Sequence, residues 1–287
     1  MDPRVHALQG ALWQWGRNKV AFESGPAGSS RKLLVLGGLG DGLLACRWAP
    51  ALSDAAAAAG WATVQPTLSS AYTGYGTGML QRDVDELSEL IAHMVAERGC
   101  ERIAIVGHST GCQIACAFAR SGSADARARL AAVSLQAPVS DQESGMLNEQ
   151  TERWLAHARA LPSDSLMPAE AHWSPITAER FLSLFSADGG QPDDLFSSYL
   201  TDAQLEARLG HMRGVPTLVA YSMDDEYVPH SVDKDALVGK LVRALGERAV
   251  PLKLAAASHA LDEPADGSAA EQFVRATVEL LRSAMPT

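Results

Sequence analysis

The stretch VGHSTGCQIACAFA, Val106–Ala119, decides the fold of this chain. An apolar run ends in Gly-His-Ser-Thr-Gly, residues 107–111, and a pattern with helical spacing begins at once. A serine between two glycines, after a strand and before a helix, is typical of a nucleophile elbow, a strained turn that lifts the hydroxyl above a sheet. The pattern predicts that Ser109 is a nucleophile. The alternative is that Ser109 only caps the helix, because serine is a favoured N-cap residue.

Strand and helix patterns alternate on both sides of this turn. Short apolar runs stopped by glycine or proline predict strands, and longer runs with apolar residues at helical spacing predict helices. This alternation favours an α/β fold with a mostly parallel central sheet and helices on both faces, in a single domain spanning 1–287. The expected strands are 32–38, 61–66, 102–109, 130–138, 215–222 and 249–257, and the expected helices include 43–60, 77–98, 110–120, 230–245 and 269–285.

Residues 140–211 interrupt this alternation. The segment shows three helical patterns, at 148–161, 177–186 and 202–210, and no convincing strand. It follows a strand end and is rich in aromatic residues, so we expect a helical lid over a site, with Trp154 and Phe185 as substrate contacts. The alternative is a helical packing layer with no access to substrate.

A serine hydroxyl is a weak nucleophile and needs a base, which an acid must orient. His259 follows the apolar strand pattern at 249–257, at the carboxyl edge where open parallel sheets bind ligands. We therefore predict His259 as the base. The acid is expected after the preceding strand, in MDDEYVP, residues 223–229, where Asp224, Asp225 and Glu226 compete. Asp225 is the first candidate and Asp224 the second.

The loop GGLGDGLL, residues 37–44, is expected to complete an oxyanion hole. The backbone N–H of Leu39 is one predicted donor and that of Thr110 is the other, while Gly38 and Gly40 let the backbone approach substrate. A dinucleotide-binding loop is a poor alternative, since the third glycine of G-x-G-x-x-G is missing from its place.

Composition narrows the possible partners. A net charge of −10 argues against nucleic acid and anionic membranes, and no segment is long enough to cross a bilayer. The cysteines form no CxxC pair, so we expect buried thiols in a reducing compartment, no metal and no cofactor. These features favour a soluble cytoplasmic protein. They leave its oligomeric state open.

Beyond the elbow, DEYVP and SHALDE, six stretches carry a closer resemblance: GGLGDGLL, PTLSSAYTGYGTGMLQRDVDEL, GHSTGCQ, QAPVSDQES, DDLFSSYL and SMDDEYVP. The chain resembles the α/β-hydrolase superfamily over nearly its whole length, and within it a eukaryotic hydrolase family that includes fungal esterases of fusarinine-type siderophores. The resemblance implies a triad of Ser109, Asp225 and His259. It also suggests a loop near the site with Tyr72 and Tyr75 as substrate contacts.

The function predicted from the sequence is hydrolysis of a small-molecule carboxylic ester or lactone through an acyl-enzyme, with a siderophore-type ester as one candidate. Two alternatives remain at this stage. The same triad also serves acyl transfer and thioester cleavage, and a hydrolase scaffold can serve as a non-catalytic binding protein.

Overall fold

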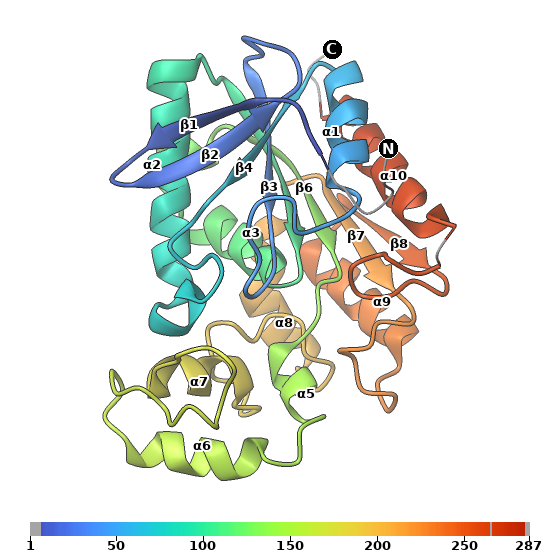
Figure 1. The fold of residues 1–287 in the computed structure, drawn as a ribbon. Coiled ribbons are helices and arrows are strands. Elements are labelled where there is room, and N and C mark those ends of the chain that lie inside the picture. Colours follow the sequence, from blue (N-terminus) through green and yellow to red (C-terminus); the bar gives the residue numbers. More distant parts are fainter. Residues whose placement is uncertain (1–6, 265, 285–287) are drawn as a thin grey trace.

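The computed structural model of the chain describes residues 7–264 and 266–284. Within these residues an eight-stranded sheet has the order β1-β2-β4-β3-β5-β6-β7-β8 (Figure 1). β1 pairs with β2, and β2 with β4, in antiparallel fashion, and every pairing from β4 to β8 is parallel. The strands are β1 (Ala11–Trp15), β2 (Lys19–Ser24), β3 (Arg31–Leu36), β4 (Ala62–Pro66), β5 (Arg102–His108), β6 (Leu130–Gln136), β7 (Thr217–Ser222) and β8 (Ala249–Leu254).

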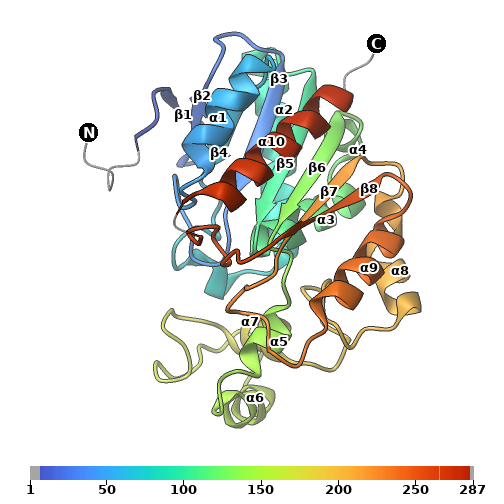
Figure 2. The same cartoon turned by 90° about the vertical axis from the view of Figure 1, so that its right-hand side faces the viewer.

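Helices cover both faces of the sheet because successive side chains of a buried strand point to opposite sides. Leu34 and Leu36 of β3 join one core, and Leu33 and Val35 join the other. Figure 2 shows α1 and α10 side by side over the second face. The first core contains α2 (Leu80–Arg98), α3 (Thr110–Ser121), α8 (Asp202–Leu209) and α9 (Lys234–Leu245), and the second contains α1 (Ala49–Ala58) and α10 (Ser268–Ser283). The predicted fold class is confirmed.

Two N-terminal features differ from the sequence expectation. The β1–β2 hairpin was not predicted, because most residues of β1 are exposed at the sheet edge and give no clear apolar alternation. The helix expected from residue 43 begins only at Ala49, with Pro50 in its first turn, a position where proline is favoured. At the other end, the expected extension of the last helix to Met285 lies outside the described residues.

The insertion, residues 140–211, adds a third layer beyond the carboxyl edge of the sheet, where β6 ends. Figures 1 and 2 show α5, α6 and α7 grouped at this end. These helices are α5 (Asp141–Gly145), α6 (Thr151–Ala160) and α7 (Ala178–Phe185). A small third core contains Trp154 of α6 and Phe181 of α7, together with Tyr75 from outside the insertion.

Polar contacts tie the insertion together. The Ser140 and Ser197 hydroxyls lie 2.6 Å apart, and Glu143 accepts a hydrogen bond from Ser198 N at 3.0 Å. These contacts join two of the sequence motifs noted above, QAPVSDQES and DDLFSSYL.

No helix among the described residues combines the length and apolar composition needed to cross a membrane.

Candidate active site

Ser109 occupies a turn that few residues other than glycine adopt. Its φ and ψ are 52° and −123°, between the end of β5 and the start of α3. The two flanking glycines are required because other backbone segments pass too close to leave room for a Cβ. A Cβ at Gly107 would lie 2.4 Å from the Gly111 carbonyl oxygen, and one at Gly111 would lie 2.4 Å from the Leu36 carbonyl oxygen. Strain of this kind persists only where the surrounding fold enforces it, and it presents the hydroxyl at the carboxyl edge of the sheet.

The His259 ring meets a carboxylate from the neighbouring loop. His259 lies after β8, and its Nδ1 is 2.8 Å from Oδ2 of Asp225. An ionised carboxylate only accepts hydrogen bonds, so Nδ1 carries the proton and Nε2 is left as the basic atom of the neutral ring. Both side chains are buried, with Asp225 at 2% exposure and His259 at 7%. The pair therefore has the geometry of a base and its orienting acid.

Backbone and side-chain contacts hold the loop after β7 in place. Asp225 Oδ1 accepts a hydrogen bond from Tyr227 N at 3.0 Å, and Glu226 accepts one from His259 N at 2.8 Å. Lys234 at the start of α9 donates to the Asp225 carbonyl oxygen at 3.2 Å. The Asp224 side chain is exposed. The roles of Glu226 and Lys234 were not foreseen, because charged residues in a loop carry no periodic signal.

The loop after β3 lies directly over Ser109. Asp41 Oδ2 accepts from Gly38 N at 2.7 Å, and Asp41 N donates back to the Gly38 carbonyl at 3.1 Å. A Cβ at Gly38 would lie 2.8 Å from Ser109 Cβ, so only glycine allows this approach. The Leu39 N–H has no acceptor among the described residues. It remains available as a donor beside Thr110, the first residue of α3.

A cavity of about 400 Å³ collects these groups. Of the predicted residues, Gly38, Leu39, Ser109, His259 and Phe185 line it. Ser109 Oγ makes no hydrogen bond to any residue that the structure describes. In unliganded sites the hydrogen bond between a nucleophile and its base is often long and tightens only when substrate binds. Several further lining residues were not predicted as substrate contacts: Asp41, His108, Val139, Asp141, Ser144, His172, Trp173, Glu226, Tyr227 and Ala260.

The other predicted substrate contacts lie outside this cavity lining. Gly40 packs against the Trp173 ring, and Tyr72 is 56% exposed. Tyr75 is buried, with its hydroxyl 2.7 Å from His172 Nε2, and burial raises its pKa to about 12. Trp154 is buried in the core of the insertion and reaches only a smaller neighbouring pocket. Tyr75 thus contacts the cavity through His172, a relation that sequence spacing does not reveal.

His108 is a second buried histidine beside the first. Its ring centre lies 4.9 Å from that of His259. Gln136 Nε2 donates to the His259 carbonyl oxygen at 3.0 Å, so Gln136 Oε1 must accept from His108 Nδ1. Burial, and then the charge of His259, lower the pKa of His108 to about 4. His108 is therefore neutral at pH 7 and adds no charge that would oppose protonation of His259.

One cluster of potential metal ligands occurs in the described part of the chain. One ligand atom each of Asp41, Cys46 and His108 lies within 4.8 Å of the others. Burial, and then the charges of Asp41 and Asp262, hold the pKa of the Cys46 thiol well above its ordinary value. A thiol binds metal as the thiolate, so Cys46 would have to lose its proton to act as a ligand, and Asp41 Oδ2 already accepts a hydrogen bond from Gly38 N.

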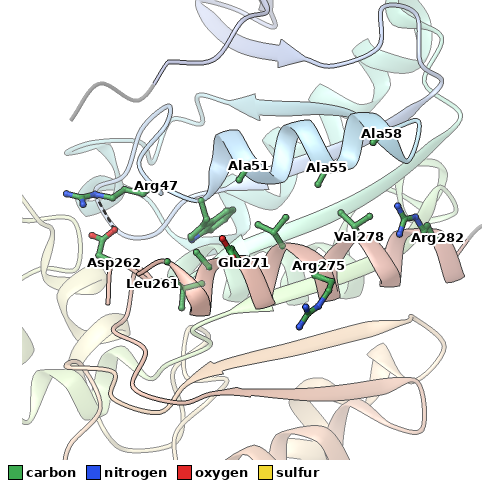
Figure 3. Close-up of a pocket in the computed structure, with 14 residues that line it drawn as sticks. Arg47, Ala51, Ala55, Ala58, Leu261, Asp262, Glu271, Arg275, Val278 and Arg282 are labelled. Carbon is green, nitrogen blue, oxygen red and sulfur yellow. Dashed lines mark ion pairs between the residues drawn. The ribbon is translucent and has the colours of Figure 1, made fainter. Parts of the chain in front are cut away.

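A larger groove of about 650 Å³ lies between α1 and α10. Figure 3 shows Ala51, Ala55 and Val278 along it, and an ion pair of 3.3 Å between Arg47 and Asp262 at one end. Its described lining includes no serine, cysteine or histidine. It therefore lacks the serine and histidine that the cavity at Ser109 brings together, and the cavity at Ser109 is the candidate active site.

The chain is similar to fungal proteins that are named as esterases or hydrolases. The chain is 30% identical to an esterase of Emericella nidulans, Esterase AN6793, over 83% of this chain and 80% of that protein. It is also 30% identical to the fusarinine C esterase sidJ of Aspergillus fumigatus, over 81% of this chain and 82% of that protein. The solved structure of the siderophore hydrolase EstB from Aspergillus fumigatus matches with a TM-score of 0.84 and 27% identity, covering 99% of this chain and 100% of that one.

The resemblance stated from the sequence is confirmed, since each of these relatives is named as an esterase or a hydrolase. A hydrolytic enzyme is the class that they share. Residues 1–282 match the family described as protein of unknown function (DUF1749). The chain belongs to the DUF1749 family and has the α/β-hydrolase fold.

Proposed function

We propose that the protein is a serine hydrolase that cleaves a carboxylic ester through the triad Ser109, His259 and Asp225. The observation that carries this proposal is the 2.8 Å contact between His259 Nδ1 and Asp225, because it leaves Nε2 as the base in the cavity that Ser109 lines. His259 accepts the serine proton as Ser109 Oγ attacks the ester carbonyl carbon. Asp225 orients the ring and stabilises its protonated form.

The reaction then proceeds in two halves. The Leu39 and Thr110 N–H groups donate to the carbonyl oxygen as it becomes an oxyanion. Collapse of the tetrahedral intermediate breaks the ester C–O bond, and the departing alcohol takes the proton from His259. Water then attacks the acyl-enzyme, with His259 accepting its proton and returning it to Ser109. The products are one alcohol and one carboxylic acid, and the triad is restored.

The substrate is proposed to be a siderophore-type ester, since relatives of this chain are named as a fusarinine C esterase and a siderophore hydrolase. The cavity volume of about 400 Å³ is in the range of small-molecule sites. The insertion supplies Ser144, Trp173 and Phe185 to the lining. We propose that it is a lid that adapts the site to its substrate.

Labelling and turnover test this proposal together. A fluorophosphonate probe is expected to label the wild type on Ser109, and Ser109→Ala is expected to abolish both labelling and hydrolysis of a nitrophenyl ester, with a kcat loss on the order of 10⁶. Ser283→Ala removes an exposed serine at the end of α10 and serves as the control. Retained labelling and turnover in Ser109→Ala would contradict the mechanism.

His259→Ala is expected to cost about as much in kcat as Ser109→Ala, and the double variant little more, because the residues of a triad act as a unit. Losses that multiply would show that the two residues act independently. Product analysis with and without an added alcohol distinguishes hydrolysis from acyl transfer on the same triad.

A further inference from the structure

The candidate cavity is acidic. Asp41, Asp141 and Glu226 line it, and no lysine or arginine does so among the described residues. Carboxylates gathered around a partly enclosed space produce a negative potential that attracts cations and repels anions. The part of a substrate that occupies this space is therefore expected to be neutral or positively charged.

Two of these carboxylates already have backbone partners. Asp41 accepts from Gly38 N, and Glu226 accepts from His259 N, so each holds a loop of the site in place. Asp141 differs. Its Oδ2 accepts from Gln113 Nε2 at 2.8 Å, and its Oδ1 has no partner among the described residues. Asp41 and Glu226 likewise keep one oxygen without a partner among the described residues, so Asp141 is set apart by its side-chain partner: unlike the other two, it holds no backbone segment of the site and can turn its carboxylate to a bound molecule.

The surroundings of Asp141 disfavour its ionised form, which a positive charge nearby would stabilise. Asp141 is the first residue of α5, just after β6, on the same sheet edge as Ser109. Burial and then the charge of Asp193 raise the pKa of Asp141 to about 7, while Arg180 and His259 and the hydrogen bond from Gln113 lower it. Arg180 is itself paired with Asp193 at 2.7 Å, so its charge is largely neutralised. A positive group brought into the cavity would supply the missing compensation.

Aromatic rings add a second feature that suits a cation. Trp173 and Tyr227 line the same cavity and are exposed, at 66% and 48%. The faces of such rings attract ammonium groups, most strongly where water is excluded. The carboxylates and the aromatic rings of the cavity therefore both favour an ammonium group as the ligand.

We propose that Asp141 is a specificity-determining residue that binds an ammonium group of the ester substrate. The substrate class is an ester whose acyl or alcohol portion carries a positively charged nitrogen near the scissile bond. This inference rests on the proposed hydrolase function. Asp141 acts on substrate binding and takes no proton in the reaction.

The test compares two nitrophenyl esters of the same shape. In one the acyl chain ends in trimethylammonium, and in the other a tert-butyl group replaces it, with several spacer lengths for each pair. Wild type is expected to show the higher kcat/KM on the cationic ester. Asp141→Asn is expected to lower the cationic-to-neutral ratio about tenfold, the size of one compensated charge in a partly buried site. Asp224→Asn removes an exposed carboxylate nearby and is expected to leave the ratio unchanged.

The pH dependence of this ratio isolates Asp141. Trimethylammonium keeps its charge at every pH. His259 acts on both esters in the same way, so its effect cancels in the ratio of their kcat/KM values. Because the ionised form of Asp141 binds the cation, the ratio is expected to rise between about pH 6 and about pH 8 in wild type and to stay flat in Asp141→Asn.

Equal losses on both esters in Asp141→Asn, or a ratio that ignores pH, would overturn the proposal and mark Asp141 as structural. Failure of the proposed hydrolase function has a different signature, namely no turnover of either ester by wild type. Recognition is then measured by calorimetric binding of choline and its uncharged tert-butyl isostere to wild type and Asp141→Asn. Equal affinities of the two molecules for wild type would overturn the proposal.

Discussion

Asp224, Asp225 and Glu226 are consecutive in the chain and have three different environments. Asp224 is exposed, Asp225 is buried against the His259 ring, and Glu226 holds the His259 backbone N–H. Their chemistry is the same, and only the direction of each side chain separates an acid that orients a base from a carboxylate that braces a loop. The environment of each carboxylate leads to a different expectation for its removal.

Asp225→Asn is expected to lower kcat by about 10⁴, because the amide favours the wrong tautomer of His259. Asp224→Asn is the matched control and is expected to have a small effect. Steady-state kinetics on a nitrophenyl ester, with circular dichroism to verify folding, measures both. A larger loss in Asp224→Asn would move the acid by one position.

At the scale of the elements, the insertion is a packed unit. Arg180 of α7 forms a buried ion pair with Asp193 at 2.7 Å and donates to the Tyr75 carbonyl oxygen at 3.2 Å. Tyr75 belongs to the short 3₁₀ helix η1 (Gly74–Thr77), which precedes α2. The insertion is therefore anchored to the body of the fold through Arg180.

Two aromatic residues of the insertion are expected to respond differently to truncation. Phe185 lines the cavity at Ser109, so Phe185→Ala is expected to change the ratio of kcat/KM between bulky and small acyl esters. Trp154 is buried in the core of the insertion, so Trp154→Ala is expected to cost about 3–5 kcal/mol locally and to lower the melting temperature. Ester panels and thermal unfolding of both variants measure the difference. A selectivity change confined to Trp154→Ala would reverse the assignment.

At the scale of the whole molecule, buried aspartates and a buried histidine change the pH dependence of stability in opposite directions. Burial is the main cause that raises the pKa of Asp83 to about 6 and that of Asp141 to about 7. The native state therefore keeps protons that the unfolded chain releases near pH 4, and each group lowers stability as pH rises from about 4 to about 7. His108 has the opposite effect, because its pKa of about 4 means that the unfolded chain binds the extra proton below about pH 6.5.

Asp83→Asn is expected to raise the free energy of unfolding at pH 8 by roughly 2 kcal/mol and to change it little at pH 4. The reason is that burial outweighs the favourable charges of Arg82 and Arg180, and Oδ1 of Asp83 is buried without a hydrogen-bond partner among the described residues. Asp85→Asn on the exposed side of α2 is the control. Denaturant unfolding at the two pH values measures the effect, and an equal shift at both would contradict it.

The sequence by itself determined the frame of this protein. Short apolar runs, helical spacing and the two glycines around Ser109 are local properties of the chain, so β5, the elbow and α3 could be predicted from one continuous stretch, residues 102–121. The position of His259 after the last strand could be predicted as well, because parallel strands bring their carboxyl ends to one edge. The edge hairpin β1–β2 could not, since its exposed residues carry little pattern.

Only the tertiary structure decided what surrounds the residues of the proposed triad. Trp154 and Tyr75, expected at the substrate, are buried outside the cavity lining, whereas Asp141 and Trp173 line it. These side chains belong to loops and to the first turns of short helices, where the backbone has no repeating geometry. The direction of each one is set by contacts with segments far away in the sequence, such as the hydrogen bond from Gln113 to Asp141, and those contacts exist only after the chain has packed.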